Sequence, residues 1–160
     1  MAEDDNHADA PAFWCDAMLG GLARWLRAAG YDAACEEGID DADLLRRALA
    51  DDRILLTCDT ELARHGAIRS GRVRGLLLPH GLDKIDQLRF VFERLGLSRR
   101  PPRCMVCGGV LEPIPKASAR PEVPARTFQW CDAYFRCRRC AKVFWRGTHW
   151  EKIEAALDRL

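Results

Sequence analysis

FWCDAMLGGLARWLR, the stretch over residues 13–27, decides the fold of this chain. It predicts a short strand over residues 12–15, an acid at the end of that strand, Asp16, and a helix that stops at Gly30. At about 100° per residue, the apolar residues of this helix share one arc, which we expect to be buried. They are Met18, Leu19, Leu22, Trp25, Leu26 and Ala29.

The opposite side of the predicted helix carries Gly20, Arg24 and Arg27, close to Asp16. A carboxylate at a strand end therefore lies beside two cations and a position without a side chain. A phosphate group could approach the backbone there. An ordinary strand followed by an amphipathic helix with a solvated polar face fits the same pattern.

Further strands and helices alternate along the chain up to residue 97. The strands are expected over residues 31–35, 53–57 and 73–78. The helices are expected over residues 42–50 with Asp41 as N-cap, from Asp59 to about 65, and from Asp83 to 95. This alternation predicts an α/β fold, a small parallel sheet with helices on both faces.

The chain has 160 residues, enough for one domain and a small second module. We expect a loose acidic tail over residues 1–11, a first domain over 12–97, a Pro-rich basic linker over 98–103 and a second module with a terminal helix over 104–160. The tail lacks the basic start and apolar run of a signal peptide, and no apolar run is long enough to span a bilayer. A cytoplasmic protein without a membrane partner is therefore expected.

The net charge of +1 hides an uneven distribution. Residues 1–97 hold 12 Lys and Arg against 18 Asp and Glu, whereas residues 98–160 hold 13 against 6. A basic second module suits a polyanion such as nucleic acid, although a simple contribution to solubility remains open.

Three acids are expected to meet at one edge of the parallel sheet. Asp16 and Asp59 each follow a predicted strand, and Asp41 begins the helix that leads into the strand before Asp59. Carboxylates that converge repel one another unless a cation lies among them, and hard oxygen ligands favour Mg²⁺ or Mn²⁺. Such a centre can assist attack on a phosphodiester. The alternative is that these acids only cap helices and form turns.

Four of the eight cysteines form two C-x-x-C pairs, Cys104 with Cys107 and Cys137 with Cys140. Two such pairs are typical of a closed tetrahedral zinc site, which supports folding and leaves no open position for catalysis. Cys131 is interpreted as a non-ligand.

Arginines and aromatic residues alternate around the second pair of cysteines. Cations interleaved with aromatics suit single-stranded RNA, which binds through phosphate contacts and base stacking. Alternatively, the aromatics form the small core of the zinc module.

With these motifs in view, the chain resembles the Mut-seven C-terminal RNase domain family. The resemblance is carried by CDAMLGGLARWLRAAGYD at 15–32, DADLLRRALADDRILLTCD at 41–59, RCMVCGG at 103–109 and CRRCAKVFWRGTHW at 137–150. It implies a PIN-like nuclease fold followed by a C-terminal zinc ribbon, and a metal-dependent ribonuclease.

The resemblance also assigns roles to single residues. It places the family's acids on Asp16, Asp41 and Asp59, with Thr57 as a supporting hydroxyl. We expect Arg24 and Arg27 to hold the RNA backbone and the ribbon to add affinity. A fourth acid, common in PIN nucleases, has no clear counterpart here, so an inactive RNA-binding or adaptor module is the alternative.

Overall fold

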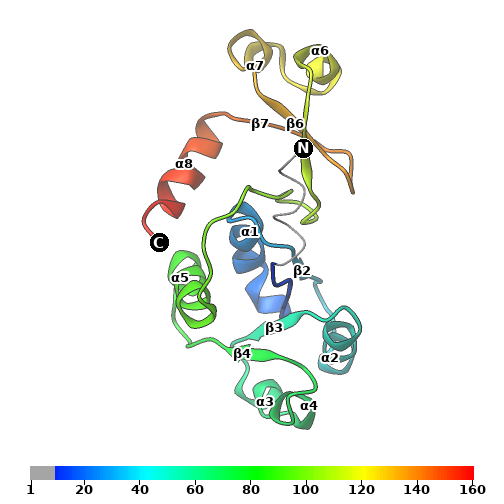
Figure 1. Cartoon of the computed structure of the whole chain (residues 1–160), viewed down its shortest axis with the longest axis vertical. Coiled ribbons are helices and arrows are strands. Elements are labelled where there is room, and N and C mark those ends of the chain that lie inside the picture. The colour runs from blue at the N-terminus through cyan, green and yellow to red at the C-terminus, as the bar shows by residue number, and fades with distance from the viewer. Residues whose placement is uncertain (1–9) are drawn as a thin grey trace.

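The computed structural model describes residues 10–160, and most of the expected tail lies outside them. Figure 1 shows an elongated molecule. A parallel sheet with its helices occupies one end, and a smaller antiparallel sheet occupies the other.

The first sheet has four parallel strands in the order β2-β1-β3-β4. They are β1 (Phe13–Cys15), β2 (Ala33–Cys35), β3 (Ile54–Thr57) and β4 (Gly75–Leu77). The predicted small parallel sheet is therefore confirmed, with strands one to three residues shorter than the sequence suggests.

Alternating side chains of β1 and β3 enter two separate cores. Phe13 and Leu56 belong to the core beneath α1 (Gly20–Ala28) and α5 (Lys84–Leu95). Trp14 and Leu55 belong to the core on the other face. The second core is covered by α2 (Asp41–Ala50), α3 (Thr60–Ala63) and α4 (Gly66–Arg69). Helices on both faces, as predicted, follow from this period-two burial.

The start of the first helix differs from the prediction. Residues Ala17–Leu19 form a 3₁₀ turn, η1, before α1 begins. Because a 3₁₀ turn has three residues per turn, Met18 is rotated away from the apolar arc and is 63% exposed. Leu19, Leu22, Leu26 and Ala29 of this arc are buried as expected, whereas Trp25 is only half-buried against the same core.

Helix caps explain where α2 and α5 begin. Asp40, not the expected Asp41, is the N-cap of α2, and its carboxylate accepts a hydrogen bond from the backbone N–H of Asp43. Both acids are good caps, so sequence alone favours neither. Asp83 caps α5 as predicted, and Gly96 ends that helix in the left-handed region, with φ of 61°.

The second sheet is antiparallel, in the order β5-β6-β7. Its strands are β5 (Leu111–Ile114), β6 (Tyr134–Cys137) and β7 (Val143–Trp145). Three short helical segments lie between β5 and β6: α6 (Lys116–Ala119), η2 (Arg120–Glu122) and α7 (Ala125–Trp130). They are too short to produce a helical pattern in the sequence, which is why none was predicted there.

The parallel-sheet part and the C-terminal part of the molecule pack against each other. Residues 98–103 lie along α1, since Arg100 N donates to Ala29 O at 3.0 Å and Arg103 N donates to Arg27 O at 2.8 Å. The terminal helix α8 (Thr148–Leu157), expected with the ribbon, buries Leu157 in the core beneath α1 and α5.

A half-buried carboxylate, Asp32, also joins the parallel-sheet part to the C-terminal part. Its Oδ2 accepts from Arg53 Nη2 at 2.9 Å and from Arg139 Nη2 at 3.4 Å, and Arg139 Nη1 donates to Cys107 O at 2.7 Å. Burial opposes ionisation of Asp32. The hydrogen bond from Arg53 and the charges of Arg139 and Arg103 outweigh it and hold its pKa below the ordinary value.

We predict that Asp32→Asn lowers the free energy of unfolding at neutral pH by about 1–3 kcal/mol, since a charge-assisted hydrogen bond is lost. A depressed pKa adds stability above the unfolded-state pKa of about 4, and this contribution disappears as the pH falls through the folded-state pKa. Urea unfolding at several pH values should therefore show a smaller acid-induced loss of stability in the variant. Asp52→Asn, whose side chain is 93% exposed, is the control and should match the wild type; equal behaviour of both variants would contradict the role of Asp32.

Candidate active site and metal centre

The hydroxyl of Thr57, at the carboxyl end of β3, links two of the predicted acids. Thr57 Oγ1 donates to Asp16 Oδ2 at 2.7 Å and accepts from the backbone N–H of Asp59 at 2.9 Å. Thr57 is 1% exposed, whereas Asp16 and Asp59 are half-buried. The structure therefore brings Asp16, Thr57 and Asp59 together at the sheet edge where ligands of open parallel sheets gather.

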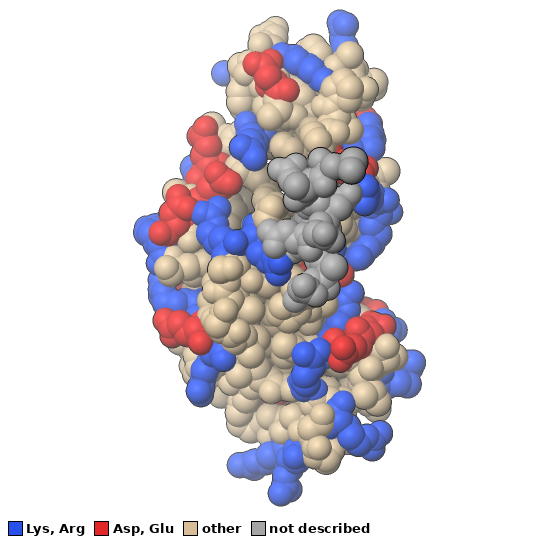
Figure 2. Space-filling view, viewed as in Figure 1, with Lys and Arg blue, Asp and Glu red and all other residues tan. Residues whose placement is uncertain are grey.

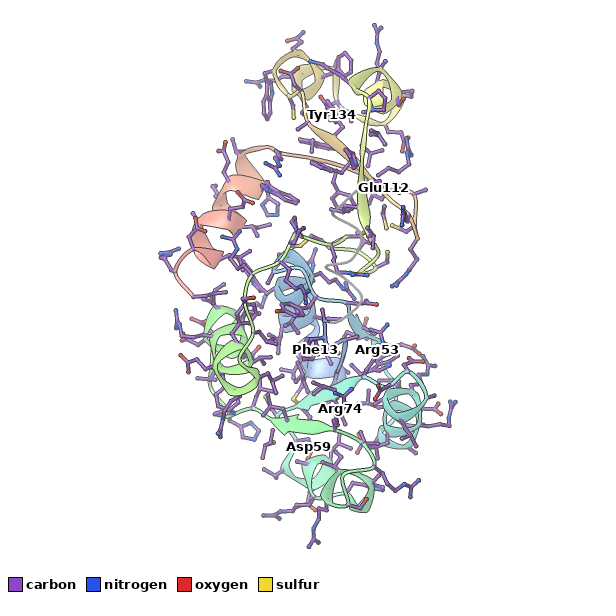
Figure 3. The ribbon with its side chains drawn as sticks, in the orientation of Figure 1. Phe13, Arg53, Asp59, Arg74, Glu112 and Tyr134 are labelled. Carbon is purple, nitrogen blue, oxygen red and sulfur yellow. The ribbon has the colours of Figure 1, made fainter. Side chains whose placement is uncertain are left out.

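Both linked acids also serve the backbone. Asp16 Oδ1 accepts from Ala17 N at 2.7 Å, and Asp59 Oδ1 caps α3 by accepting from Glu61 N at 2.7 Å. Capping is therefore a real part of their role. Within residues 10–160, Asp59 Oδ2 accepts no hydrogen bond, so that oxygen remains available to a ligand. Figure 3 shows Asp59 beside α3, at the end of the molecule far from the ribbon residue Tyr134.

Asp41 is the exposed first residue of α2. Because α2 begins beyond the carboxyl end of β2, its first turn lies toward the same edge as Asp16. The Asp41 carboxylate makes no hydrogen bond or ion pair with any described residue. It is therefore not used in capping, which falls to Asp40.

The three carboxylates do not form a tight cluster. Among the described residues, the four cysteines are the only group of three or more ligand side chains whose atoms lie within 4.8 Å of one another. Two oxygens that both bind one Mg²⁺ directly, at about 2.1 Å, would be at most about 4.2 Å apart. In this arrangement the three acids cannot all contact one ion directly.

A pocket of about 480 Å³ opens beside Asp16. Its walls come from Gly20 and Arg24 on α1, Cys35 and Glu37 at the end of β2, and Met105 with Val106 between the first two zinc-site cysteines. The sequence indicated Gly20 and Arg24. An acid just after a predicted strand was the only signal for Glu37, and nothing local indicated the other walls.

Arg27 is buried inside the protein and does not face the solvent, where it was expected to hold the RNA backbone. Its side chain is 8% exposed, and it donates to Ala33 O at 2.8 Å, Met105 O at 2.9 Å and Val106 O at 3.1 Å. Because the guanidinium is committed to protein carbonyls, it is poorly suited to hold an RNA backbone. Arg24, by contrast, is exposed and pairs with no described residue.

The four cysteines fit a zinc ion. Cys104 Sγ lies 3.7 Å from Cys140 Sγ, and Cys107 Sγ lies 3.4 Å from Cys137 Sγ. Tetrahedral zinc with Zn–S bonds of about 2.3 Å puts its sulfurs about 3.8 Å apart. Cys131 belongs to the ribbon core and is not in this group.

Backbone groups prepare one of these sulfurs for a metal. Burial alone would raise the pKa of the Cys137 thiol, but hydrogen bonds from the backbone N–H groups of Cys140 and Arg139 lower it to about 7. Burial raises the pKa of the Cys104 thiol to about 12. A thiolate is the form that binds zinc, so these backbone hydrogen bonds favour the metal-binding form of Cys137.

The family model for the Mut7-C RNAse domain matches residues 11–157, nearly the whole chain. The chain belongs to this family. No curated protein and no solved structure shows significant similarity to it.

Membership of the Mut7-C RNAse domain family gives the chain a nuclease-type function, with RNA as the implied substrate. The match covers both the parallel-sheet part and the ribbon, so the family's domain includes the four-cysteine group. No helix within residues 10–160 is long and apolar enough to cross a membrane.

The aromatic residues of the ribbon divide between core and surface. Tyr134 is 1% exposed and lies in the ribbon core, whereas Trp130 is 54% exposed. Several cations predicted to face RNA pair with acids, among them Arg136 with Glu122 and Arg138 with Glu112. On the face seen in Figure 2, Lys and Arg extend along the whole molecule, so basic character is not confined to the ribbon.

We predict that Cys137→Ser lowers bound zinc from one ion per chain to well below one, because a closed site tolerates the loss of a thiolate poorly. Zinc content after dialysis and thermal unfolding are the measurements. Cys131→Ala, in the same ribbon, is the control and should retain its zinc. Full zinc content in the Cys137 variant would contradict the assignment.

Proposed function

We propose that this chain is a metal-dependent ribonuclease that hydrolyses phosphodiester bonds of single-stranded RNA. The observation that carries the proposal is the hydrogen-bonded group of Asp16, Thr57 and Asp59 at the ligand edge of the sheet, in a chain of an RNase family. Asp41 is proposed as the third acid of the site.

The donor chemistry of the acids suits Mg²⁺ or Mn²⁺. Asp16, Asp41 and Asp59 offer hard carboxylate oxygens, and Mg²⁺ characteristically takes one or two carboxylates while keeping several waters. The three carboxylates are too far apart for all of them to bind one ion directly, which is compatible with direct ligation by Asp16 and Asp59 and with Asp41 acting through water. When bound, such an ion would supply Lewis-acid stabilisation of charge on the phosphate.

The protein side chains have separable tasks in this proposal. Thr57 fixes the orientation of Asp16 by donating a hydrogen bond, and it holds the backbone of Asp59 in place. Arg24, exposed and without a partner among residues 10–160, would bind a phosphate of the RNA backbone. Asp41 contributes carboxylate oxygens that no described residue uses.

The ribbon is proposed to hold structural zinc at Cys104, Cys107, Cys137 and Cys140 and to assist RNA binding. Thiolate zinc sites persist in a reducing compartment, which supports a cytoplasmic location.

An RNA-binding or adaptor module without catalytic activity is the second candidate. The separation of the three carboxylates favours it, because a catalytic ion then has fewer direct ligands. Salt-sensitive RNA binding without metal-dependent cleavage of varied RNAs would establish this alternative.

We predict that Asp16→Asn reduces Mn²⁺-dependent cleavage of a labelled single-stranded RNA by about 100-fold or more, because a carboxylate ligand is lost. Asp41→Asn should also reduce cleavage, but less. Asp43→Asn is the matched control, since Asp43 lies in the same helical turn as Asp41 and is paired with Arg46. Cleavage is compared with and without added Mn²⁺ rather than with a chelator, which would also remove zinc. Undiminished cleavage by the Asp16 variant would refute the site.

We further predict that Thr57→Val, which keeps the side-chain shape, reduces cleavage at least about tenfold, in the range seen when groups that orient metal ligands are removed. The variant should also lose about 1–3 kcal/mol of unfolding free energy, because Asp16 Oδ2 and Asp59 N each lose a partly buried hydrogen bond. Thr57→Ser, which keeps the hydroxyl, should retain most of the cleavage activity and most of the unfolding free energy. Failure of serine to rescue cleavage would show that the hydroxyl is not the relevant group.

A further inference from the structure

The pocket beside Asp16 has the size and position of a substrate subsite. Its volume of about 480 Å³ lies within the range of small-ligand pockets, roughly 300–1,000 Å³. Ala17, the residue after Asp16, lines it, and Cys35 Sγ, which also lines it, donates to Asp16 O at 3.6 Å. An RNA chain with a phosphate at Asp16 would therefore place a neighbouring nucleotide here.

Two charged side chains of the pocket are available to a ligand. Arg24 and Glu37 both line it, yet neither makes an ion pair or hydrogen bond with the other or with any residue among 10–160. The adjacent Glu36 shows the contrast, because it pairs with Arg47 and does not line the pocket. Opposite charges that face one pocket without pairing suit a ligand with both an anionic group and hydrogen-bond donors.

The remaining walls suit the flat face of a base. Met105 is half-buried and Val106 is 53% exposed, so both present apolar surface. Methionine adapts readily to the shape of a ligand. Across the pocket, Gly20 has no side chain and Ala23 has only a methyl group, so this wall of α1 leaves room for a ligand.

We propose that this pocket binds one nucleotide of the RNA next to the cleaved phosphate and that Glu37 selects bases with an exocyclic amino group; this rests on the proposed ribonuclease function. Arg24 binds the phosphate of that nucleotide. The Glu37 carboxylate only accepts hydrogen bonds, so it accepts from the amino group of cytosine or adenine, which uracil lacks.

The subsite also requires the zinc ribbon. The wall made by Met105 and Val106 lies between two zinc-site cysteines, and Arg27 holds it to α1 through the carbonyls of both residues. Loss of zinc would release this wall. The ribbon therefore contributes to RNA binding at the active site itself, in addition to its outer surface.

Binding is measured separately from cleavage, with the zinc-loaded full chain carrying Asp16→Asn and no added Mg²⁺ or Mn²⁺. Fluorescence anisotropy of labelled oligocytidylate, oligoadenylate and oligouridylate reports affinity. We expect cytidine and adenosine oligomers to bind about tenfold more tightly than the uridine oligomer, the scale of one charged hydrogen bond. Glu37→Gln should reduce this preference severalfold, whereas the matched control Glu36→Gln should preserve it.

Arg24→Ala should weaken binding of all three oligomers about tenfold, and the control Arg94→Ala, at the far end of α5, should not. Val106→Asp changes an exposed wall residue, so the fold should survive while binding weakens; zinc content and thermal unfolding verify the fold. Equal affinities for the three oligomers, or equal effects of each variant and its control, would overturn the subsite even if Asp16 is needed for cleavage. Failure of the ribonuclease proposal itself would be seen separately, as RNA cleavage that depends on neither Asp16 nor Mn²⁺.

Discussion

The buried guanidinium of Arg27 is the interaction on which the arrangement of the two parts depends. A buried cation is costly unless its donors find acceptors, and here Nε and Nη1 donate to three backbone carbonyls. One of these carbonyls belongs to β2, and the other two belong to Met105 and Val106, between the first two cysteines of the ribbon. The same side chain therefore fixes α1 against its own sheet and fixes the zinc site against α1.

Asp32 reinforces this junction from the other side. Its carboxylate accepts hydrogen bonds from Arg53 in the parallel-sheet part and from Arg139 in the ribbon, and both cations stabilise its negative charge. With α8 packed on the first core, three separate contacts connect the ribbon to the sheet. The ribbon is therefore better regarded as part of the nuclease fold than as an independent appendage.

The sheet and most of the acid site could be predicted from the sequence because they depend on local patterns. The apolar runs of β1 and β3 and the acids that follow them identify a parallel sheet and its ligand edge. The capping of α2 could not be decided, since Asp40 and Asp41 are equally good caps. Met18 was misplaced because a 3₁₀ turn has no clear signature in so short a stretch.

The pocket walls and the burial of Arg27 could not be predicted, because they arise where distant segments meet. Nothing near Met105 in the sequence indicates that its carbonyl accepts from Arg27. A helical projection places Arg27 on a polar side, but it does not show whether water or protein faces that side. Prediction from a single sequence is therefore weakest at the junction of the two parts.

The burial of Leu157 has a consequence for biosynthesis. A nascent chain still held in the ribosomal exit tunnel at α8 lacks the contact of Leu157 with the core beneath α1 and α5, and with it one of the contacts that join the sheet to the ribbon. The mature arrangement is then completed only after residues 148–157 emerge.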